Sequence, residues 1–208
     1  MSLSGRPTLR RRLLLAFAGL ALLSSAPLLA EDLDPASLFD SAKTAYGEKK
    51  YGKALQDLNL LVKELGRLRM ESLKTTLPAA PAGWTAEDVE GDASAMGLAV
   101  FGGGISVKRT YRKGDETQVT VTLTADSPMV AGFAAMFQFA PQGQVVTVKG
   151  RRALLEVDKD DKSADLKLLL NGNTSLLQVE GRSVTREDVG TLFANALDLD
   201  GMEKALQN

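Results

Sequence analysis

Pro78 and Pro81 separate two different spacings of apolar residues, and this change constrains the fold more than any other feature of the sequence. Before these prolines, over residues 38–68, apolar side chains recur every three or four positions, which is typical of amphipathic helices. After them, over residues 97–179, apolar and polar residues alternate, which is typical of half-buried strands. The sequence therefore predicts an α+β protein with an N-terminal helical hairpin followed by an antiparallel sheet domain.

The helical part is expected over residues 31–77, as two helices joined by a turn at residues 47–50. The second helix is the longer one, and it carries a heptad-like apolar stripe formed by Leu55, Leu58, Val62 and Leu65. Such a stripe has to be buried somewhere. We expect it to pack on the rest of the chain, on a second copy in a homodimer, or on another protein.

The middle of this hairpin resembles a tetratricopeptide (TPR) repeat. In that family an aromatic residue opens the second helix and alanine follows three residues later, as Tyr51 and Ala54 do here. The departures are Leu38 at the family's Trp position, Ser41-Ala42 at its Leu-Gly positions, and the absence of its final proline. The resemblance covers one unit, and single repeats cannot bury their apolar face alone, so it implies a hairpin that packs on the second part of the chain, on another copy or on a partner. An ordinary helical hairpin is the alternative.

Residues 78–83 are expected to form a linker, and residues 84–208 an α+β domain with the only tryptophan, Trp84, as a core anchor. The domain is expected to contain an antiparallel sheet with one helix inserted between its hairpins and another helix at its end. The strands are expected around Ile105–Tyr111, Val119–Leu123, Val145–Lys149, Ala153–Val157, Leu166–Leu170 and Leu176–Val179.

The inserted helix is expected in the uncharged run of residues 127–142, with Ser127 as its N-cap and Pro128 at its first position. We expect it to cover the apolar face of the sheet. The alternative is that it presents a partner or ligand surface. In either case the side chains concerned are Met129, Phe133, Met136 and Phe137.

The order of elements after Pro81 resembles the Mog1/PsbP-like sandwich. It is also similar to uncharacterised secreted proteobacterial proteins that carry three glycines before an Arg-x-Tyr strand, here residues 102–104 and Arg109-Thr110-Tyr111. Both resemblances imply a binding or assembly role, and neither carries a residue-level site.

Residues 1–30 have the layout of a secretory signal peptide, with four arginines, an apolar run from Leu13 to Leu23, and small residues before the acidic pair Glu31-Asp32. We expect cleavage after Ala30 and a periplasmic or secreted bacterial protein without a stable membrane anchor. A retained anchor and export by the twin-arginine route are the alternatives. The whole chain has 25 basic and 26 acidic residues, so removing the four arginines leaves a net charge of −5, which disfavours nucleic acid as a partner.

The chain has no histidine and no cysteine, and this narrows its chemistry. Histidine is the usual general base and metal ligand near neutral pH, so zinc sites and Ser-His-Asp or Cys-His catalysis are excluded. We expect no enzymatic activity, cofactor or metal. One basic cluster, formed by Lys108, Arg109 and Arg112, is expected to be a solvated strand face, with an anion-binding patch as the alternative.

Two functional hypotheses follow. The first is an exported protein-interaction or assembly factor that docks through the hairpin stripe and the Met/Phe helix. The second is a carrier of a lipid or small apolar molecule, held between that helix and the sheet; this would require an enclosed apolar cavity.

Overall fold

The computed structural model describes residues 34–92, 104–139, 143–158, 160 and 162–207. The expected signal peptide and the glycines at 102 and 103 lie outside these residues. Two antiparallel helices come first, α1 (Pro35–Gly47) and α2 (Tyr51–Lys74). The Asp34 carboxylate caps α1 by accepting hydrogen bonds from the backbone N–H groups of Ala36 and Ser37, at 3.2 and 3.1 Å. The expected helical hairpin is therefore present.

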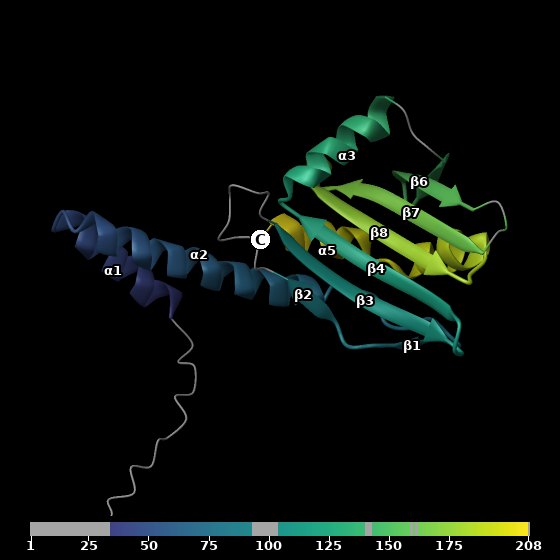
Figure 1. The fold of residues 1–208 in the computed structure, drawn as a ribbon, viewed down its shortest axis with the longest axis horizontal. Helices are drawn as coiled ribbons and strands as arrows, with labels where there is room; N and C mark the ends of the chain where they lie inside the picture. The colour runs from purple at the N-terminus through teal and green to yellow at the C-terminus, as the bar shows by residue number, and fades with distance from the viewer. Residues whose placement is uncertain (1–33, 93–103, 140–142, 159, 161, 208) are drawn as a thin grey trace, which may run out of the picture. The chain divides into compact units, whose positions relative to one another are not determined.

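The rest of the chain is built on one antiparallel sheet of eight strands, which confirms the α+β class (Figure 1). The strands follow the order β1-β3-β4-β8-β7-β6-β5, and β2 pairs with β3. Their bounds are β1 (Thr85–Ala86), β2 (Glu90–Asp92), β3 (Ile105–Lys113), β4 (Thr117–Ala125), β5 (Gln144–Val148), β6 (Arg151–Val157), β7 (Ser163–Leu170) and β8 (Ser175–Arg182).

One face of the sheet carries the main core. Alternate residues of β3, β4, β7 and β8 point into it, among them Val107, Val121, Leu166 and Val179, all with no exposed surface. The C-terminal segment covers this face with η3 (Asp188–Phe193), α4 (Ala194–Ala196) and α5 (Leu199–Gln207), which lie behind the sheet in Figure 1. The period of two thus separates a buried face from a polar one.

The inserted helix α3 (Pro128–Phe139) begins at the expected proline but does not cover the apolar face. It lies over the opposite face. Phe137 of α3 packs under Arg152 of β6, whose guanidinium carbon is 4.8 Å from the ring centroid. Arg152 points away from the main core, because the next residue of the strand, Ala153, is buried in that core. Val130 and Phe137 are buried there, outside the main core cluster. The expectation for α3 was wrong because the C-terminal helices already occupy the apolar face.

The segment expected to be a linker packs closely on the sheet. The hydroxyl of Tyr111 in β3 donates a hydrogen bond of 2.6 Å to the carbonyl oxygen of Pro78. Trp84 is buried as expected, with its ring 5.0 Å from that of Phe193 in η3 and at 87° to it. From α1 to α5 the chain forms one compact unit.

The last turns of α2 fix the hairpin to the sheet. Arg69 forms an ion pair with Asp126 at the end of β4, and it also donates a 2.8 Å hydrogen bond to the carbonyl oxygen of Leu206 in α5. Met70 and Leu73 pack into the core from the same part of α2. Among the described residues, no helix combines the length and apolar character needed to span a bilayer.

Candidate docking surface

The hairpin exposes a row of large apolar side chains along one side. Eight of them are between 41% and 69% exposed, and seven of these, without Leu68, form the set used below. We call this set the hairpin face; its members are Phe39, Tyr46, Tyr51, Leu55, Leu58, Val62 and Leu65. The residues of α2 follow each other at intervals of four, three, four and three, so they lie on one side of the helix. Phe39 and Tyr46 lie seven residues apart on one side of α1.

A ring contact joins the two helices of the hairpin face. The rings of Tyr46, near the end of α1, and Tyr51, at the start of α2, have centroids 6.0 Å apart. This contact places the exposed aromatic residues of α1 on the same side of the hairpin as the α2 stripe. The α1 and α2 parts of the hairpin face therefore meet at the turn between the two helices.

Small residues explain why the stripe is exposed. The seam between α1 and α2 is filled by Ala42, Ala45, Ala54 and Leu61, all buried. Alanines let two helices approach closely, and this seam takes up one side of α2 and leaves the neighbouring side open. Leu58, Val62 and Leu65, which the sequence singled out, are thus on the surface, and no described element covers them.

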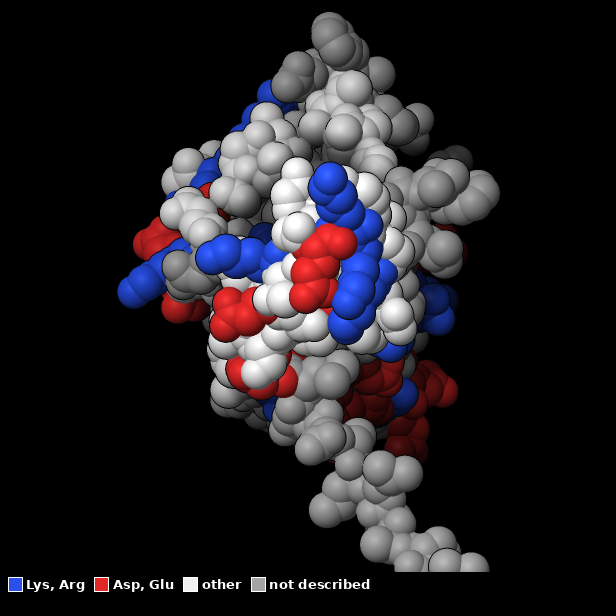
Figure 2. Space-filling model, turned by 90° about the vertical axis from the view of Figure 1, so that its left-hand side faces the viewer, with Lys and Arg blue, Asp and Glu red and all other residues white. Residues whose placement is uncertain are grey.

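The other side of the hairpin is polar. Asp57 is 5% exposed, accepts a 2.7 Å hydrogen bond from the Ser41 hydroxyl and pairs with Lys53 at 3.0 Å. The hydrogen bond from Ser41, and then that from Lys53, lower the pKa of the Asp57 carboxyl below its usual range. Figure 2 faces the free end of the hairpin, where basic and acidic side chains lie beside each other and next to uncharged surface. In the turn between the helices, Lys50 forms an ion pair with Glu48 at 2.8 Å. The hairpin therefore separates a charged side from an apolar one.

The residues expected on α3 divide between surface and core. Met129 is 82% exposed, so the expectation that it is mainly core was wrong. Phe137 is buried and half-buried Phe133 contacts it, with ring centroids 5.8 Å apart. The side chain of Met136 lies outside what the structure describes. The sequence could not place Met129, because a helix with apolar residues on most of its circumference gives no direction to its buried side.

The basic cluster on β3 is paired within the chain. Lys108 lies 2.9 Å from the Glu90 carboxylate, and Arg112 lies 2.6 Å from Glu87. Arg109 donates hydrogen bonds to the carbonyl oxygens of Glu87 and Pro78, at 2.9 and 3.2 Å. These three cations therefore stabilise the contacts of β1, β2 and the preceding segment with β3.

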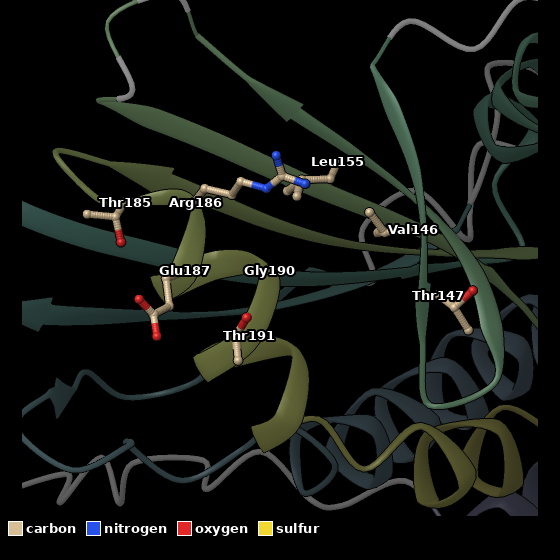
Figure 3. Close-up of a pocket in the computed structure, with 8 residues that line it drawn as sticks. All are labelled: Val146, Thr147, Leu155, Thr185, Arg186, Glu187, Gly190 and Thr191. Carbon is tan, nitrogen blue, oxygen red and sulfur yellow. The ribbon is translucent and has the colours of Figure 1, made fainter.

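A cleft of about 480 Å³ opens between β5, β6 and η3, and we call it the C-terminal cleft (Figure 3). Its apolar side is formed by Val146 and Leu155, and the Arg186 side chain extends toward Leu155. The remaining lining residues are Thr147, Thr185, Glu187, Gly190 and Thr191. The cleft has hydroxyls and single charges of each sign, and it contains no paired nucleophile and base.

Three carboxylates lie side by side on the polar face of the sheet. Asp165 in β7 is paired in register with Glu156 in β6 and with Glu180 in β8. Burial, followed by the charge of Glu180, raises the pKa of the Asp165 carboxyl. Lys167 compensates part of this charge through a 2.7 Å ion pair with Glu156. Among the described residues, no group of His, Cys, Asp or Glu side chains has a geometry that could hold a metal ion.

Comparison of the chain with known proteins found no matching family model, no similar curated protein and no similar solved structure.

Sequence reasoning missed the aromatic part of the hairpin face. Phe39 and Tyr46 were not singled out, and Tyr51 was read only as part of a repeat-like pattern. A signal was present for Tyr51, because it precedes Leu55 by four residues and Leu58 by seven and so continues the stripe. No such signal existed for α1, since the side of α1 that contacts α2 depends on the turn between them.

Proposed function

We propose that the protein is an exported, non-catalytic protein-interaction or assembly factor that docks through the hairpin face. The observation that carries this proposal is the exposure of the seven side chains. Three exposed aromatics and four aliphatics together present roughly 600 Å² of apolar surface, given about 150–250 Å² for an aromatic side chain and about 100 Å² for an aliphatic one. The largest apolar patch on a typical monomer is about 300–600 Å² and is often functional, so a patch at the upper end of this range favours an interaction site.

The arrangement favours a protein partner over a small apolar ligand. Carriers enclose their ligand in a concave site. Neither the C-terminal cleft nor the smaller cleft beside Asp40 and Lys53 is lined by a member of the hairpin face. A row of side chains along two helices is instead suited to packing against another helix or sheet. The carrier hypothesis, with α3 as the ligand-binding element, is the alternative, but the 82% exposure of Met129 does not provide the enclosed apolar cavity that it requires.

Site-specific photo-cross-linking in the producing cell tests this proposal. A benzophenone amino acid replaces Leu55 on the hairpin face or, as the matched control, Gln56, the neighbouring exposed residue outside it. We expect protein adducts at position 55 and few or none at 56. Equal adduct yields at the two positions would argue against a docking surface. Adducts with lipid or another apolar compound at Phe133, without protein adducts at position 55, would favour the carrier.

A further inference from the structure

We infer that the partner of the hairpin face is a second copy of this chain, joined to the first through a symmetric four-helix bundle of two hairpins. This inference rests on the proposed function, because it names the occupant of the same surface. Three features of the described residues support it: the spacing of the apolar residues, the charge beside them, and the area that self-association would bury.

The spacing of the hairpin face is that of a helix that packs against a similar helix. On α2, Leu55 and Val62 take the first position of two successive heptads, and Leu58 and Leu65 take the fourth. Such a row interlocks with an identical row when two helices cross at about 20°. Valine at a first position with leucine at the fourth positions is compatible with pairwise packing. Because each copy also brings its α1, the product is a four-helix bundle.

The flank of the stripe favours a partner without a strong charge. Two exposed residues on α2, Gly52 and Asn59, border the stripe on the side away from α1, and both are uncharged. At these two positions of α2, identical copies can therefore meet without placing like charges opposite each other. Gly52 also has nothing within 4 Å of where a Cβ would be, so a second backbone can approach it closely.

The area is sufficient for a specific dimer. Burying the hairpin face on both copies removes roughly 1,200 Å² from water, twice the area exposed on one copy, and this reaches the lower end of the range for stable interfaces, about 1,200–2,000 Å². A symmetric interface also uses each favourable residue twice. The surface therefore needs no second type of partner to be buried.

Sedimentation equilibrium of the purified protein tests this inference, with Leu58→Glu as the disrupting variant and Gln56→Glu as the control that introduces the same residue outside the face. Leu58 lies midway between Tyr51 and Leu65. We expect a dimer at protein concentrations of about 100 µM or below. The dissociation constant should rise by about 30-fold or more in Leu58→Glu, as for a central interface residue, and by less than about threefold in Gln56→Glu.

Disulfide cross-linking gives a second readout that does not depend on a destabilising variant. The chain has no cysteine, so a single Leu58→Cys variant contains only one thiol. Because Leu58 is central, it meets its own copy whether the two helices run parallel or antiparallel. We expect Leu58→Cys to form a covalent dimer under mild oxidation, and Gln56→Cys to remain largely monomeric.

The outcomes separate this inference from the proposed function. A dimer that persists in Leu58→Glu and fails to cross-link at position 58 would overturn the inference. A monomer at all concentrations, combined with photo-adducts to a different protein at position 55, would overturn the inference and leave the proposed function intact. A monomer without photo-adducts at position 55 would overturn both.

Discussion

Phe193 is the side chain whose removal should cost most in the fold that supports the hairpin. It has no exposed surface, and its ring contacts Trp84 and Tyr111 edge-on, at centroid distances of 5.0 and 5.1 Å. Phe193→Ala removes these contacts and leaves a cavity among the strands and the segment before β1. Substitutions of this kind cost about 3–5 kcal/mol, and with its two ring contacts we expect Phe193→Ala to cost about 4 kcal/mol.

Urea unfolding followed by tryptophan fluorescence measures this cost, because Trp84 is the only tryptophan and packs directly on Phe193. For a protein of this size a loss of about 4 kcal/mol also lowers the melting temperature by about 8–16 °C. Phe39→Ala is the matched control: it deletes the same atoms from a side chain that is 56% exposed, and at concentrations too low for self-association it should cost less than about 1 kcal/mol.

The reasoning would be refuted if Phe193→Ala destabilised the protein by no more than Phe39→Ala does. Such a result would mean that the C-terminal helices do not close the core, and that the sheet is stable without them.

Three further predictions concern the sheet and its covering helices. Gly181→Ala should lower stability by about 1–3 kcal/mol in thermal unfolding, because the new Cβ would lie 2.3 Å from a methyl group of Val184; a wild-type melting temperature would contradict the packing. Asp165→Asn should stabilise the protein at pH 7, because the raised pKa means that ionised Asp165 opposes folding; the gain should shrink as the pH falls through the raised pKa and vanish below the usual aspartate pKa of about 4, and a destabilised variant at pH 7 would exclude the proposed repulsion. Arg151→Met should lower stability at neutral pH, because it removes the ion pair with Glu203. The hydrogen bond from Arg151 lowers the pKa of Glu203, so the stability that the ion pair contributes is present above the usual glutamate pKa and disappears as the pH falls through the lowered pKa. A loss of stability that is constant with pH would rule out the ion pair as its cause.

Most of the fold could be predicted from alternation and turn residues. The strands around Val107, Val121 and Val179 alternate clearly. Thr185 and Asp188, three residues apart, are a sequence signal for a helix start, and in the structure the Thr185 N–H donates to the Asp188 carboxylate at 3.0 Å. The pairing of β4 with β8 could not be predicted, because alternation fixes the two faces of a strand and not its neighbour. The two-residue strand β1 and the three-residue strand β2 were missed, since such short segments show no period.

The candidate site was predicted only in part. The stripe of Leu55, Leu58, Val62 and Leu65 could be read from the sequence, but its exposure could not, because exposure depends on how α1 packs. The reverse holds for α3: its apolar character was evident, and its place on the polar face was not, because that depends on which helices cover the core. A sequence shows how much apolar surface an element has; tertiary packing decides where that surface lies.

The labelling rate of a thiol on the hairpin face shows whether this face is covered in the cell, because docking protects it whichever protein covers it. Single variants Leu55→Cys and Gln56→Cys are treated with a permeant maleimide in the intact producing cell and as dilute purified protein, and the modified fraction is measured by mass spectrometry. We predict that Leu55→Cys reacts at least about tenfold more slowly in the cell than in dilute solution, while Gln56→Cys changes little. Equal ratios for the two variants would show that the hairpin face is free in the cell, and would contradict the account.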